Sequence, residues 1–179
     1  MTEYHGSHGT SRSRAAEIAR HGFTLSKDQV RRSKAVYLWK KCRNWTVLAK
    51  GWYRQQASRG RLYARDADSR GVVLYALATV PTVNYIDLCD QEAIDAIDEI
   101  ADIANIDKSD REQIAAVYER YLQETERRLG NPIDIYETEV APPDPVFCQE
   151  YSIKLLGAPR CYCVRKPAVL RVYDSEETE

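Results

Sequence analysis

Two histidines, each followed by glycine, lie within the first nine residues of the chain. They occur in the tripeptides His5-Gly6-Ser7 and His8-Gly9-Thr10. A neutral imidazole can donate or accept a hydrogen bond at a sugar hydroxyl. A neighbouring glycine lets a flat amide approach the main chain closely. Each pair therefore offers a side chain that can bind a hydroxyl and a main chain that an amide can approach.

The residues after the second pair indicate the elements that position it. A helix predicted over Arg14–His21 ends at Gly22, fourteen residues after His8. A polar segment then leads to the apolar, strand-like run Ala35–Trp39. Tyr37 within this run offers a large ring face on which a flat ligand can stack.

This order of elements resembles the opening of the NAD-dependent ADP-ribosyltransferases of the diphtheria-toxin and poly(ADP-ribose) polymerase type. That family has His-Gly-Ser/Thr, a helix, Gly with a large apolar residue, and a strand that carries Tyr. The segment Gln149–Ile153 similarly resembles the family's strand with a Glu. The resemblance implies that NAD is the substrate and that no metal is needed. It implies the catalytic residues His8, Tyr37 and Glu150, and the NAD-binding residues His8, Gly9, Thr10, Tyr37 and Trp52.

The resemblance leaves alternatives open at single positions. His8 keeps the family spacing to Gly22, so His5 is the reserve candidate. The family has Gly-x-Gly immediately before its Tyr, where this chain has Ser33-Lys34-Ala35. Taken singly, a histidine near an N-terminus is usually a solvated loop residue, and Tyr37 in an apolar run is usually part of the core.

Composition predicts a single globular domain over residues 1–179, with 44% apolar and 30% charged residues. No apolar run of transmembrane length and no signal-peptide pattern is present, so we expect a cytoplasmic protein without membrane contact. The five cysteines are scattered except for Cys161-Tyr162-Cys163, and their spacing is not that of a metal site. We therefore expect reduced thiols.

Charge is distributed unevenly along the chain. Residues 1–65 hold fifteen Lys and Arg against three Asp and Glu, whereas residues 66–145 hold six against nineteen. Aromatic residues such as Trp52 and Tyr63 lie among the basic ones, a combination that suits phosphates and unstacked bases. A nucleic acid partner is therefore favoured. In the alternative, the acidic middle folds over the basic start and neutralises it.

The remaining patterns complete an α+β prediction. They indicate a helix over Asn44–Ser58, a strand over Gly71–Val80, two helices at about 90–130, and strand-like runs at Val146–Leu155, Arg160–Val164 and Val169–Tyr173, followed by a frayed acidic tail, Asp174–Glu179. The resemblance implies an ADP-ribosyltransferase-like fold, with two small antiparallel sheets packed together and helices around them. The helical pair is then an insertion, with a packing role or as a docking surface for an inhibitor.

The expected function is transfer of one ADP-ribose from NAD to a macromolecule, with release of nicotinamide. RNA or DNA is the favoured acceptor. A small enzyme of this kind would harm its own cell, which suggests a toxin restrained by an antitoxin protein or used against phage. The alternatives are a protein-directed ADP-ribosyltransferase, an NAD glycohydrolase, and a catalytically silent module that binds a nucleotide or a protein.

Overall fold

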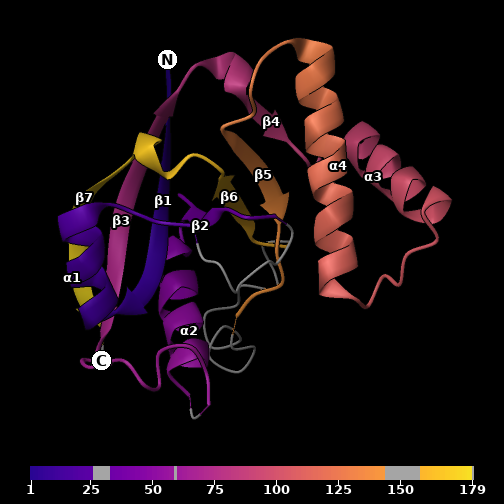
Figure 1. Cartoon of the computed structure of the whole chain (residues 1–179). Helices are drawn as coiled ribbons and strands as arrows, with labels where there is room; N and C mark the ends of the chain where they lie inside the picture. Colours follow the sequence, from indigo (N-terminus) through magenta and orange to yellow (C-terminus); the bar gives the residue numbers. More distant parts are fainter. Residues whose placement is uncertain (26–32, 59, 144–157, 179) are drawn as a thin grey trace.

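The structure is a computed structural model that describes residues 1–25, 33–58, 60–143 and 158–178. Within these residues the fold is α+β, with four α-helices around one mixed sheet of seven strands (Figure 1). The strand order is β4-β5-β6-β2-β1-β3-β7. The strands are β1 (Thr2–Ser11), β2 (Val36–Lys40), β3 (Gly71–Val80), β4 (Tyr85–Asp87), β5 (Ile135–Glu139), β6 (Arg160–Val164) and β7 (Leu170–Thr178). The helices are α1 (Arg12–His21), α2 (Trp45–Ala57), α3 (Gln91–Ile103) and α4 (Arg111–Leu129).

The N-terminal segment is a strand inside the sheet, where the sequence indicated none. β1 pairs antiparallel with β3 along its whole length, from Thr2 opposite Val80 to Ser11 opposite Gly71. The strand predicted over Gly71–Val80 is confirmed, and it is buried along nearly its whole length because its side chains pack into clusters on both faces of the sheet. The His-Gly-Thr motif therefore lies on a central strand.

The described strands form one sheet, whereas two small sheets were expected. The junction between its two halves is narrow, because β1 and β2 pair only at Gly6 with Lys40 and Ser7 with Trp39. Beyond Ser7 the two strands diverge, although β1 continues to Ser11. The halves β7–β3–β1 and β2–β6–β5–β4 thus share a junction of two residue pairs, which we call the seam.

The acidic C-terminal tail is also a strand, so the expectation of a frayed end was wrong. β7 pairs with β3 as far as Thr178, opposite Gly71. Its acids are neutralised locally, since Glu176 lies 2.8 Å from the Nζ of Lys50 and Glu177 lies 3.1 Å from Arg12. Ion pairs with the basic N-terminal half therefore stabilise this edge of the sheet.

The two acidic helices at about 90–130 are confirmed as α3 and α4. They lie side by side at one end of the sheet (Figure 1) and connect β4 to β5. These two strands are parallel, and a parallel pair requires a crossover connection of this kind. Asp110 caps α4 with its carboxylate. None of the helices in the described ranges is both long and apolar enough to span a membrane.

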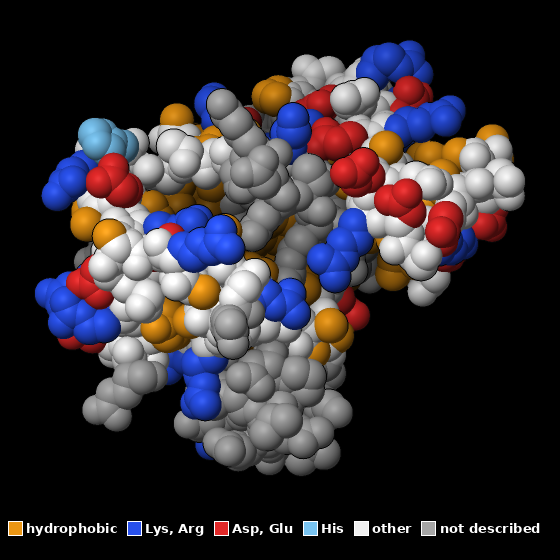
Figure 2. Space-filling view, turned by 60° about the horizontal axis from the view of Figure 1, so that its bottom comes forward, with side chains coloured by type: hydrophobic (Ala, Val, Ile, Leu, Met, Phe, Trp, Pro, Cys, Tyr) orange, Lys and Arg blue, Asp and Glu red, His pale blue; other side chains and the backbone are white. Residues whose placement is uncertain are grey.

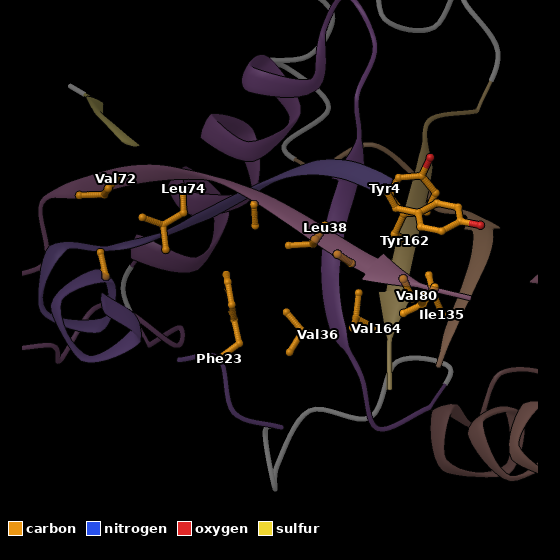
Figure 3. Close-up of a cluster of buried hydrophobic side chains, with 13 residues drawn as sticks. Tyr4, Phe23, Val36, Leu38, Val72, Leu74, Val80, Ile135, Tyr162 and Val164 are labelled. Carbon is orange, nitrogen blue, oxygen red and sulfur yellow. The ribbon is translucent and has the colours of Figure 1, made fainter. Parts of the chain in front are cut away.

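Buried side chains form separate clusters on the two faces of the sheet. One face carries the cluster shown in Figure 3, which runs from Val72 and Phe23 at one end to Tyr4 and Ile135 at the other. On the opposite face, α2 packs through Leu48 against β1, β2 and β3. The α3–α4 pair covers β5 and β6 on that same face. The gap between β1 and β2 beyond Ser7 lies between the buried clusters on the two faces of the sheet.

Candidate active site

A pocket of about 400 Å³ lies where β1 and β2 diverge beyond the seam. This volume is within the range of about 300–1,000 Å³ that is usual for small-molecule sites. The pocket brings together all five residues that the resemblance assigns to NAD. They come from three elements: His8, Gly9 and Thr10 from β1, Tyr37 from β2, and Trp52 from α2. Their role in binding NAD stays a prediction.

His8 bridges the diverging strands with its side chain. Its Nδ1 lies 3.0 Å from the main-chain carbonyl oxygen of Tyr37. A carbonyl can only accept, so Nδ1 carries the proton and Nε2 keeps its lone pair. Burial lowers the pKa of His8 below its ordinary value, although the hydrogen bond to Tyr37 opposes this shift. The ring is therefore neutral at pH 7, with an acceptor nitrogen left for a ligand.

The reserve histidine lies on the other face of β1. Side chains alternate across a strand, so residues three apart point to opposite faces. His8 lines the pocket, whereas the His5 ring packs edge-on against Tyr173, with centroids 5.7 Å apart. Of the two histidines, His8 is therefore the one that can reach a ligand in this pocket.

Gly9 directs its main chain into the gap between the strands. In the antiparallel pair β1–β2, every second residue of β1 exchanges hydrogen bonds with β2. The Lys41 N–H donates to the His5 C=O, so the next hydrogen-bonded pairs would be Ser7 with Trp39 and then Gly9 with Tyr37. The ladder stops after Ser7, and the His8 side chain takes the Tyr37 carbonyl instead. The N–H and C=O of Gly9 consequently face the pocket.

Helix α2 explains why residue 9 has no side chain. A Cβ built on Gly9 would lie 1.9 Å from the carbonyl oxygen of Ala49. That distance is far below van der Waals contact, and the atom belongs to the main chain of a helix. The close approach of α2 therefore requires glycine here whether or not a ligand binds.

Two hydrogen bonds to Ser33 hold the hydroxyl end of the Tyr37 side chain. Its hydroxyl donates to the Ser33 carbonyl at 3.0 Å and accepts from the Ser33 N–H at 3.3 Å. Ser33 occupies a position where the family has glycine, and it is fully buried. Its hydroxyl lies 2.8 Å from the hydroxyl of Tyr136 on β5. The serine thus connects the segment before β2 to the rest of the sheet.

The Gly-Phe pair after α1 supports the histidine. Gly22 ends α1 with a φ of 76° and donates its N–H to the Ile18 carbonyl at 2.8 Å. Phe23 then packs edge-on against the His8 ring, with centroids 5.5 Å apart. The large apolar residue that follows the glycine therefore fixes the orientation of the imidazole.

Sequence reasoning did not identify as site residues three interacting residues at and behind the pocket wall. Tyr63 is almost fully buried, and its hydroxyl donates to the Gly9 carbonyl at 3.2 Å. The Arg14 guanidinium lies over the Tyr63 ring and pairs with Asp66, with 2.8 Å between Nε and Oδ2. Arg14 and Tyr63 line the pocket, and Asp66 lies behind them. The only sequence signal was an aromatic residue within a basic segment.

Glu150 lies outside the described residues, as do Gln149 and the predicted strand Val146–Leu155. The described ends of this connection lie together, because the Val140 N–H donates to the Pro159 carbonyl at 2.9 Å. Pro143 lines a smaller hollow of about 270 Å³ together with Tyr37. The described residue Pro143, which follows β5, therefore lies beside Tyr37.

A group of metal-ligating type on the sheet is already neutralised. Asp87, Cys89 and Glu137 could offer ligand atoms within 4.8 Å of one another, and no other such group occurs in the described ranges. Glu137 is fully buried, however, and its carboxylate accepts from Lys40 at 2.8 Å and from Arg160 at 3.0 Å. Burial, with a hydrogen bond to Asp87, raises the pKa of Cys89 to about 12. These contacts disfavour a cation.

None of the ion pairs given for the described residues joins the acidic helices to the basic N-terminal third. Basic residues before position 66 form ion pairs with Asp66, Glu137, Glu176 and Glu177 or with Glu17 on α1. Figure 2 shows most of the visible acidic side chains over the α3–α4 end and basic ones around a central hollow. Five exposed basic residues have no acidic partner among the described ion pairs: Lys34, Lys41, Arg43, Arg61 and Arg65.

No protein-family model matches the chain, and no curated protein matches it.

Proposed function

We propose that this protein is an NAD-dependent mono-ADP-ribosyltransferase that acts on a macromolecule. One observation carries the proposal: five residues assigned to NAD by a sequence resemblance come from three elements and line a single pocket. Residues brought together by chance in a sequence pattern would not be expected to meet in this way.

The geometry suits the nicotinamide end of NAD. A carboxamide offers one donor and one acceptor group, and the N–H and C=O of Gly9 facing the gap complement them. The Nε2 lone pair of His8 can accept from a ribose hydroxyl. Tyr37 and Trp52 supply aromatic surface for the pyridine ring. The walls therefore provide partners for the amide, the ring and the sugar.

Glu150 is the proposed third catalytic residue. As the bond to nicotinamide breaks, positive charge develops on the ribose, and a nearby carboxylate stabilises that charge. What supports this assignment is the resemblance of Gln149–Ile153 to the family's strand with a Glu, together with the position of the described residue Pro143 beside Tyr37. Glu17 also lines the pocket but pairs with Arg20 at 3.0 Å on an exposed face of α1.

A nucleic acid is the proposed acceptor. Two of the exposed basic residues without an acidic partner among the described ion pairs, Lys34 and Arg61, adjoin the pocket residues Ala35 and Leu62 in the sequence. Cations beside an aromatic-walled pocket suit a phosphate backbone with unstacked bases. We further propose a toxin-like setting, with an antitoxin partner or a role against phage.

The test uses the purified protein, NAD labelled in its adenine, and a total cell lysate. We expect nicotinamide release and transfer of label to material that nuclease removes, with a yield that falls as salt increases. His8→Ala should lose both signals, and His5→Ala is the matched control that should keep them.

Other outcomes separate the alternatives. Release of nicotinamide without transfer of label would identify an NAD glycohydrolase. Label that only protease removes, and that is indifferent to salt, would identify a protein acceptor. Failure to bind or consume NAD would refute the proposed function and leave a module that binds some other nucleotide or a protein.

A further inference from the structure

The Gly9 carbonyl has a partner in the pocket wall that the proposed mechanism does not use. Tyr63 follows α2 in the sequence, and its hydroxyl donates to this carbonyl at 3.2 Å. The Tyr63 side chain is buried, with 3% of its surface exposed. Burial, the largest influence, raises the pKa of its hydroxyl, so the group stays a donor at any ordinary pH.

Arg14 holds the Tyr63 ring in place. The guanidinium carbon of Arg14 lies 5.1 Å from the centroid of the ring. The same guanidinium donates to the Leu62 carbonyl at 3.3 Å, and so grips the main chain next to Tyr63. The ring therefore has a charged group stacked over it and a fixed backbone behind it.

Asp66 fixes the arginine in turn. It accepts from Arg14 at 2.8 Å and 3.2 Å, in the two-bond arrangement that fixes both the position and the plane of a guanidinium. It also accepts from the hydroxyl of Ser11, the residue that caps α1. Burial alone would raise the pKa of Asp66, but the bonds from Arg14 and Ser11 outweigh it and lower the pKa. Asp66 is therefore ionised at neutral pH.

We infer that Tyr63 is a positioning residue that orients the Gly9 carbonyl to accept the amide N–H of the nicotinamide. This inference rests on the proposed function. A carbonyl oxygen has two lone pairs, so one bond from Tyr63 leaves a second site for a ligand. Arg14 and Asp66 act through Tyr63, and the chain of contacts ties the end of β1 to the segment after α2.

The test compares two substrates in Tyr63→Phe. NAD carries a primary amide, whereas the 3-acetylpyridine analogue of NAD has a methyl ketone in its place and cannot donate to Gly9. One neutral hydrogen bond corresponds to a change in affinity of about three- to tenfold. We expect the KM for NAD to rise by about that factor with kcat little changed, and the KM for the analogue to stay the same. The dissociation constant of free nicotinamide should rise in parallel.

Tyr53→Phe is the matched control. The Tyr53 ring stacks against Tyr63, with centroids 6.3 Å apart, but its hydroxyl donates to the Ser69 carbonyl at the surface. It should leave both substrates unaffected, and thermal unfolding of both variants checks that they fold.

Equal loss with NAD and the analogue would show that Tyr63 only supports the fold, and no loss with either would show that it has no role. Both results would refute the inference while wild-type turnover of NAD still upheld the proposed function. A wild-type protein that neither binds nor consumes NAD would overturn the proposed function itself, and this inference with it.

Discussion

Gly9→Ala should destabilise the fold severely, irrespective of any ligand. The new Cβ would meet the Ala49 carbonyl oxygen at 1.9 Å, its carbonyl carbon at 2.7 Å and its Cα at 3.3 Å. Relief would require α2 and β1 to separate by more than an ångström. Overpacking of a close-packed core costs about 1–3 kcal/mol, and the cost is greatest where main chain must move. We therefore expect a loss of about 3 kcal/mol in the free energy of unfolding.

The comparison that isolates the clash is Gly130→Ala. Gly130 ends α4 with a φ of 68°, and a Cβ there would meet no atom within 4 Å. This change should cost only about 1–2 kcal/mol, from the left-handed conformation alone. Urea denaturation followed by the fluorescence of the three Trp residues measures both variants.

A second substitution tests which atom causes the clash. Adding Ala49→Gly to Gly9→Ala removes the Ala49 methyl group but keeps its carbonyl, so stability should not recover. Recovery would mean that the side chain is responsible. A Gly9→Ala protein as stable as Gly130→Ala would refute the close approach of α2 altogether.

Three further predictions concern the chemistry. His8→Ala should weaken NAD binding and turnover together, while His5→Ala should affect neither; isothermal titration and nicotinamide release measure this, and loss at His5 alone would reverse the assignment. Glu150→Gln should raise the barrier to transfer by more than about 2 kcal/mol and leave the dissociation constant of NAD nearly unchanged, so wild-type turnover would exclude Glu150. Burial lowers the pKa of His8 in the folded protein below the ordinary 6.5. Below about pH 6.5 this histidine therefore binds more protons in the unfolded chain than in the folded one. Its contribution should make the free energy of unfolding decrease as pH falls below that value, and urea titrations should show a smaller decrease in His8→Ala.

Elements with a strong pattern could be predicted from the sequence. The run Gly71–Val80 was almost continuously apolar, and the helices α3 and α4 had clear periodicity and recognisable ends. β1 had neither, because residues such as Gly6 and Ser7 are small or polar. They are buried because α2 and β2 approach closely, and a Cβ at Gly6 would lie 2.6 Å from that of Leu38. The sequence around Gly6 does not indicate that two other elements approach it so closely.

Part of the candidate site could also be predicted from the sequence, and part could not. Residues in the His-Gly-Thr motif and Tyr37 could be named from type and spacing, because their elements follow one another along the chain. The contact between Tyr63 and Gly9 joins residues 54 positions apart and depends on how the segment after α2 returns to β1. Only the assembled fold brings that pair together, so no spacing rule could identify it.

The seam also has a consequence for folding during synthesis. β1 is made before its neighbours β2 and β3, which follow only at positions 36–40 and 71–80, and β6 and β7 are made after all of these. Cys161 on β6 lines the pocket, and β6 holds the outer edge of β2. Pairings of such long range form slowly. A nascent chain therefore has an incomplete pocket until β6 has left the ribosome, long after the His-Gly-Thr motif on β1 has done so.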